Sequence, residues 1–75
     1  MGLGFAILIA ESEAGDYQPV GVVGSISEAR EVANLDLKNR MRSLENGGSP
    51  MCVYCYKVWG QDEAGSYRIV EEIEV

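Results

Sequence analysis

The sequence predicts an α+β fold in which one helix packs on one face of a four-stranded antiparallel sheet, in the order ββαββ. Three observations lead to this prediction. Short β-rich runs occur in two pairs, a long amphipathic segment separates the pairs, and one turn motif occurs twice. The chain has 75 residues, which suits a single domain spanning 1–75 with one small core.

Four runs are predicted to be strands because they are rich in β-branched, aromatic and other apolar residues. They cover residues 5–11 (FAILIAE), 17–23 (YQPVGVV), 51–59 (MCVYCYKVW) and 67–75 (YRIVEEIEV). Pro19 has no N–H to donate to a neighbouring strand, so the second run is expected at a sheet edge. A shift of one residue in pairing would exchange the two faces of a strand, and the runs alone leave the register open.

Residues 25–45 are predicted to form the helix. Ser25 and Glu28 have the spacing of a capping box, in which each side chain accepts a backbone N–H of the first turn. The sequence Asn46-Gly47-Gly48, followed by Pro50, is a typical helix stop. Apolar side chains at helical spacing form one stripe that is expected to face the core: Ile26, Ala29, Ala33, Leu37, Met41 and Leu44.

A five-residue motif, E-A-G-x-Y, occurs at 13–17 and again at 63–67. Glu and Ala suit the central positions of a type I turn, and the following Gly suits the left-handed position of a bulged hairpin. The motif therefore predicts two hairpins. A duplicated hairpin and two independent solutions to one turn both explain it, and the second is favoured because the flanking strands share little.

The first and third strands are apolar on both faces, although one helix can cover only one. If the side of Cys52, Tyr54, Tyr56 and Val58 meets the helix, part of the remaining apolar surface is left free, and a monomer rarely exposes such a patch. The residues expected on this free surface are Leu8, Val53, Cys55 and Trp59. We therefore expect a homodimer, or another protein partner, on this face. Coverage by loops or chain ends is one alternative, and a lesser interface on the outer helix face, at Val32 and Leu35, is another.

The charge balance argues against nucleic-acid binding. Twelve acidic and six basic residues give a net charge of −6, whereas phosphate backbones require a basic face. The helix carries four of the basic residues, but acidic residues alternate with them, which is typical of a salt-bridged surface. These basic residues are Arg30, Lys38, Arg40 and Arg42.

No cofactor, metal or enzymatic activity is expected. The chain lacks His, the commonest general base and metal ligand. Cys52 and Cys55 form a C-x-x-C, but two thiols without His do not complete a four-ligand zinc set. The pair falls within a predicted strand rather than at a helix N-terminus, where a redox pair usually lies, so both are expected to be buried packing thiols.

We expect a complete cytoplasmic protein without a membrane segment. The longest apolar run is far shorter than the roughly 20 residues that span a bilayer. No Lys or Arg precedes Arg30, so the positive start of a secretory signal is missing.

The acidic balance supports a different class of function as an alternative. An acidic inhibitor that mimics nucleic-acid charge would bind a basic protein. The residues proposed for this role are Asp62, Glu63, Glu71, Glu72 and Glu74.

The segment at 20–30, VGVVGSISEAR, resembles a recurring type of small uncharacterised protein from bacteria, phages and mobile elements such as integron cassettes. That type has a hairpin, a Ser/Glu-capped helix and then strands with acidic–apolar alternation, as at 67–75. The resemblance implies the fold and a mobile-element origin. It implies no catalytic residue, because no activity is attached to the type. The C-x-x-C strand departs from the pattern.

Overall fold

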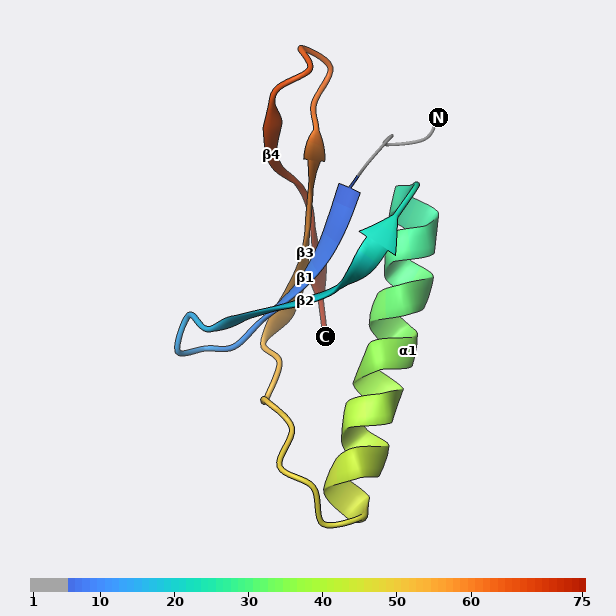
Figure 1. Cartoon of the computed structure of the whole chain (residues 1–75), viewed down its shortest axis with the longest axis vertical. Helices are drawn as coiled ribbons and strands as arrows, with labels where there is room; N and C mark the ends of the chain where they lie inside the picture. Colours follow the sequence, from blue (N-terminus) through green and yellow to red (C-terminus); the bar gives the residue numbers. More distant parts are fainter. Residues whose placement is uncertain (1–5) are drawn as a thin grey trace.

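A computed structural model describes residues 6–75 as a four-stranded antiparallel sheet and one helix, in the order ββαββ (Figure 1). The elements are β1 (Ala6–Glu11), β2 (Tyr17–Val23), α1 (Ile26–Glu45), β3 (Cys55–Gln61) and β4 (Tyr67–Glu74). The strand order is β2-β1-β3-β4, with both hairpins intact and β1 paired to β3 in the centre. The predicted α+β architecture is confirmed. Phe5, expected in the first strand, lies outside the described residues.

The third strand is displaced from its predicted position. It begins at Cys55 rather than at Met51 and continues to Gln61, where the second turn closes the hairpin. β1 ends at Glu11, whose carbonyl accepts a hydrogen bond from the Tyr54 N–H at 2.7 Å. Residues 51–54 lie beyond the end of β1 and are not part of a strand. They belong to the connection that runs from the far end of α1 back to the sheet (Figure 1).

The helix begins and ends as the sequence predicts. The Ser25 side chain accepts a hydrogen bond from the Glu28 N–H at 3.1 Å, which stabilises the first turn. After Glu45 the Gly48 N–H donates to the Ser43 carbonyl at 2.8 Å, which satisfies a carbonyl of the last turn.

Burial of α1 against the sheet decreases toward its C-terminal end, and Leu37 is the half-buried residue of the predicted stripe that still packs against the core. Ala29 and Ala33 are buried, whereas Met41 and Leu44 are 58% and 65% exposed. The prediction that the last two face the core was wrong because α1 continues past the end of the sheet (Figure 1). Val32, predicted to lie off the stripe, packs against the core.

The core lies between α1 and one face of the sheet. Leu8 pairs directly with Val58, and Ala10 pairs with Tyr56, so these side chains share the face that α1 covers. Alanines lie on both sides of this contact, which lets the helix backbone approach the sheet closely. The buried cluster contains Ala6, Leu8, Ala10, Val23, Ala29, Ala33, Tyr56 and Val58.

The two repeated motifs form the same turn. The Gly15 N–H donates to the Ser12 carbonyl, and the Gly65 N–H donates to the Asp62 carbonyl, both at 3.0 Å. Gly15 and Gly65 have φ angles of 89° and 85°, in the left-handed region that favours glycine. The motif therefore predicted both hairpin turns correctly.

The equivalence extends beyond the turns. In each hairpin the pairing shifts by one residue at the same place, so that Val20 and Val70 are the extra residues of two β-bulges fifty positions apart. The pairing of β1 with β3 follows the same rule. If each residue of the pair Ile7–Trp59 is exchanged for the residue fifty positions away, the result is the pair Lys57–Ile9, which also exists. A pseudo-two-fold axis thus passes through the sheet, which favours a duplicated hairpin over two independent turn solutions.

Gly15→Ala and Gly65→Ala are expected to destabilise the fold by similar amounts, about 1–2 kcal/mol each, because both place a Cβ at a left-handed φ. Gly21→Ala is the matched control, since Gly21 has no such φ and open space around its Cβ position. Urea unfolding monitored by circular dichroism measures the three differences. Equal stabilities for all three variants would contradict this account of the turns.

Candidate functional site

An apolar row crosses the sheet on the face opposite α1, which we call the open face. Ile7 pairs with Val22 on one side and with Trp59 on the other, and Trp59 pairs with Ile69. Directly paired residues share a face, so these four side chains form one row over all four strands. We call Val22, Ile7, Trp59 and Ile69 the apolar row. No helix or strand among residues 6–75 covers it (Figure 1).

Neighbouring side chains enlarge this apolar surface. The ring of Tyr67 stacks on that of Trp59, with centroids 4.6 Å apart and planes inclined by 21°. Ile9 lies next along β1 and pairs with Pro19. Val22, Tyr67 and Ile69 are 60%, 46% and 38% exposed, which is unusual for large apolar side chains that belong to one continuous apolar surface.

A charged cluster occupies the other end of the open face. The Lys57 Nζ lies 3.0 Å from the buried Glu11 Oε2 and 3.8 Å from a carboxylate oxygen of Glu72. Glu74 pairs with Cys55 in the adjacent position. We call Glu11, Lys57, Glu72 and Glu74 the charged end.

Glu11 and Lys57 of the charged end and the adjacent Cys55 have shifted pKa values. The bond with Lys57 lowers the pKa of the Glu11 carboxyl, and the same bond raises the pKa of the Lys57 ammonium. Burial is the main cause that raises the pKa of the Cys55 thiol. A general base, a reactive amine or a thiolate nucleophile would need the opposite shifts. Within residues 6–75, no cluster of three or more potential metal ligands forms.

Of the four residues expected on the free surface, Trp59 lies on the open face. Leu8 does not: it is completely buried under α1, so its predicted place beside Trp59 was wrong. Val53 belongs to the connection after the helix, where it is half-buried against the core, rather than to a strand. Cys55 points away from α1 but is itself buried.

The error on Leu8 is an error of register. The expectation was conditional on the side of Cys52, Tyr54, Tyr56 and Val58 meeting the helix, and it put Leu8 on the other face. In the structure Leu8 and Val58 are direct partners and share one face. The open face of β1 is formed by Ile7 and Ile9 instead. Sequence reasoning missed these two, together with Val22, Tyr67 and Ile69. The alternation of residues along β1 places Ile7 and Ile9 on one face and Leu8 on the other. Because both sets are apolar, the alternation does not show which face is open.

The cysteine pair also differs from its prediction. Both thiols are free, and Cys52 is exposed in the connection rather than buried in a strand. Only Cys55 is the buried packing thiol that was expected.

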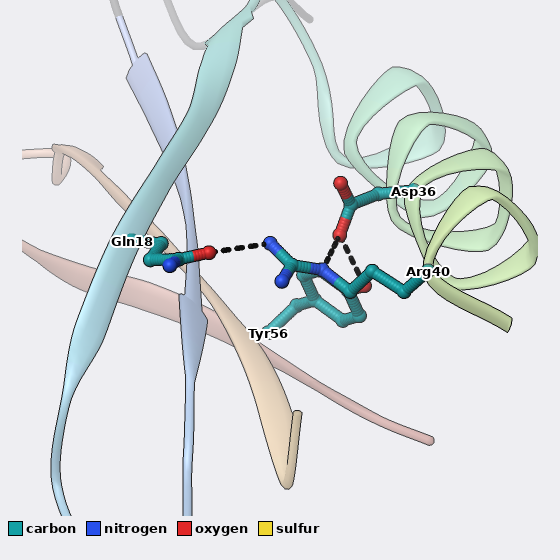
Figure 2. A network of polar contacts seen from close by, with 4 residues as sticks. All are labelled: Gln18, Asp36, Arg40 and Tyr56. Atoms are coloured by element: carbon teal, nitrogen blue, oxygen red, sulfur yellow. Dashed lines mark hydrogen bonds and ion pairs between the residues drawn. The ribbon is translucent and has the colours of Figure 1, made fainter. Parts of the chain in front are cut away.

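A polar network joins α1 to the covered face of the sheet (Figure 2). The Tyr56 hydroxyl donates to an Asp36 carboxylate oxygen at 2.6 Å, and the Arg40 Nε donates to the same oxygen at 2.7 Å. Arg40 also donates to the Gln18 side-chain oxygen at 3.0 Å. Burial and the bond to Asp36 raise the pKa of the Tyr56 phenol well above its ordinary value. Each of the four side chains has a partner within the network, so we interpret it as positioning the helix.

A second apolar surface lies where α1 extends past the sheet. A cleft of about 220 Å³ separates the end of the helix from the connection, and Met41, Leu44 and Met51 are among the residues that line it. The residues that line this cleft include no aromatic side chain. We therefore take the open face as the candidate functional site.

Comparison with known proteins adds no relative. No family model, no curated protein and no solved structure matches the chain. The resemblance to small proteins of mobile elements therefore stays a prediction. In the described part of the chain, α1 does not have the apolar length needed to cross a membrane.

The Glu11–Lys57 pair predicts an acid-dependent stability. Because the folded-state pKa of Glu11 is lowered, its ionised form stabilises the fold above the ordinary carboxyl pKa of 4.5, and this contribution is lost as the pH falls through the folded-state value. Lys57→Met is expected to remove that part of the acid dependence. Lys38→Met, which changes an exposed helix lysine, is the control.

The measurement for this pair is the thermal midpoint of each protein at a series of pH values between about 2 and 6. Wild type and Lys38→Met should lose stability in parallel, and Lys57→Met should show a flatter profile. Three parallel profiles would show that the pair contributes nothing to the acid dependence.

Proposed function

We propose that the protein is a non-enzymatic association module that forms a homodimer through the open face of its sheet. The observation that carries the proposal is the apolar row, which no helix or strand of residues 6–75 covers and in which Trp59 stacks on the partly exposed ring of Tyr67. Tyr and Trp are enriched among the residues that dominate binding energy at protein interfaces. A second copy would bring an identical face with the same twist and size.

The small core supports association. The largest fully buried side chains are Tyr56, Leu8, Val23 and Val58, and alanines form much of the remainder. Chains of this size often need an additional source of stability, and a partner subunit is a common one. Stacking two open faces would join two molecules, each only 16 Å thick along its shortest axis, into four layers in the order helix, sheet, sheet, helix.

The sheet edges are less suited to association than the open face. β2 carries Pro19 and the bulge at Val20, and β4 carries the bulge at Val70 and a series of charged residues. Bulges, proline and charge on edge strands are features that disfavour pairing with another chain. The face therefore fits a partner better than the edges do.

A cytoplasmic location is part of the proposal. Cys52 and Cys55 are free thiols, and Cys52 is exposed. Free thiols of this kind persist in reducing compartments, whereas secreted domains of this size are usually rich in disulfides.

The acidic inhibitor remains the alternative, with a basic protein as its partner. Its five residues lie on different parts of the molecule. Glu71 is paired with Arg30 of α1, Glu72 and Glu74 belong to the open face, and Asp62 accepts two backbone N–H groups of its own turn. A charge mimic needs these groups on one surface, so this distribution favours the apolar interface.

Sedimentation equilibrium over a range of protein concentrations, at low and high salt, tests the proposal. A dimer whose dissociation constant changes little with salt is the expected result, because apolar burial is not screened. A monomer at every concentration would refute self-association. A dimer that dissociates at high salt would refute the apolar interface in favour of one based on charge.

A further inference from the structure

The open face is divided into a charged half and an uncharged half. Every charged side chain assigned to this face by the strand pairing lies at the charged end, which holds three carboxylates and one ammonium group. On the other side of the apolar row, β3 and β4 contribute Gln61 and Tyr67, which are direct partners. The apolar row separates the two halves.

This division distinguishes two ways of stacking identical faces. A two-fold axis parallel to the strands would place the charged end of one copy over the charged end of the other, so that two clusters of three carboxylates and one ammonium group would share one end of the interface. A two-fold axis across the strands would instead place the charged end over the uncharged half of the partner. Two clusters that each hold more carboxylates than ammonium groups repel each other in an interface, so the second arrangement is favoured.

We propose that the dimer has its two-fold axis across the strands, along the apolar row. This inference rests on the proposed function and specifies its geometry. Each residue of the row then lies against the same residue of the second copy, as an isologous interface requires on its axis. The hydroxyl of Tyr67 and the amide of Gln61 lie over the partner's charged end, where they supply neutral hydrogen-bonding groups to Glu72 and Lys57.

The two arrangements place Val22 and Ile69 differently. These residues occupy the two ends of the apolar row, on the outer strands β2 and β4. With the axis across the strands, Val22 meets Val22 of the second copy and Ile69 meets Ile69. With the axis along the strands, Val22 of one copy meets Ile69 of the other. Stacked sheets are about 10 Å apart, too far for a direct disulfide, so a short bis-maleimide is the appropriate probe.

The experiment compares Val22→Cys and Ile69→Cys, each in a Cys52→Ser background that removes the exposed native thiol. Treatment with the bis-maleimide should convert each variant alone to a covalent dimer. The Cys52→Ser parent, which keeps the buried Cys55, should remain uncrosslinked. Circular dichroism and sedimentation at the same concentration establish that each variant is folded and dimeric before treatment.

Two results would overturn the inference while leaving the proposed function intact. One is crosslinking that occurs only when the two variants are mixed, which indicates an axis along the strands. The other is a dimer by sedimentation with no crosslink in any sample. A parent and variants that sediment only as monomers would overturn the homodimer itself, so the two failures are distinguishable.

Discussion

Trp59→Asp is expected to convert the dimer into a folded monomer. The side chain lies at the centre of the apolar row on the open face, so the substitution places a carboxylate in the proposed interface without entering the core. Loss of a central aromatic residue costs about 2 kcal/mol or more, which weakens the dimer by ~30-fold or more in Kd. Sedimentation equilibrium measures the change, and the helical circular dichroism signal should be largely retained.

Leu35→Asp is the matched control for this experiment. Leu35 is 60% exposed on the outer side of α1, far from the apolar row, so its substitution should leave the mass unchanged. If Trp59→Asp remained dimeric and folded, the open face would not be the interface. If it unfolded, Trp59 would belong to the core instead.

Leu8→Ala is expected to destabilise the monomer by about 2–5 kcal/mol, because it leaves a cavity between β1 and α1. A loss of this size is a large part of the total stability of a small domain. The comparison is made in the Trp59→Asp background, which removes the contribution of dimerisation. Urea unfolding gives the difference in the free energy of unfolding.

Ile7→Ala is the neighbouring control, since Ile7 lies on the opposite face of the same strand and is only half-buried. Its cost in the same background should be clearly smaller than that of Leu8→Ala. A larger cost at Ile7 than at Leu8 would mean that the faces of β1 are reversed.

Local features of this fold could be predicted from sequence because their causes are local. The Ser25 cap, the helix stop near Gly48 and both E-A-G-x-Y turns depend on residues within one or two turns of each other. Each motif contains the group that makes its decisive hydrogen bond or the glycine that adopts the required φ. The helix and the two turns therefore lie at, or within one residue of, the positions that the sequence predicts.

The register of β1 against β3 could not be predicted in this way. It depends on contacts between segments about fifty residues apart, and both faces of β1 are apolar, so the pattern does not select one face. Leu8 was therefore assigned to the wrong face, while Ile7 was overlooked. The alanines beside Leu8 allow α1 to approach the sheet closely. The sequence pattern alone does not show that these alanines lie in the contact.

The extent of the sheet was also beyond the sequence pattern. The helical stripe continues through Met41 and Leu44, but the strands end before them, and the connection rather than the sheet adjoins these residues. Val53 was predicted to be a strand residue for the same reason. No local feature of the sequence shows that β1 ends at Glu11 and that β3 therefore begins only at Cys55.

The intrinsic fluorescence of Trp59 during dilution tests the central claim most directly, because this is the only tryptophan in the chain and it lies in the proposed interface. We expect the emission maximum to shift to longer wavelength as the dimer dissociates, with the same midpoint as the loss of mass in sedimentation. Emission that stays constant while the mass halves would contradict it, because the copies would then meet through another surface.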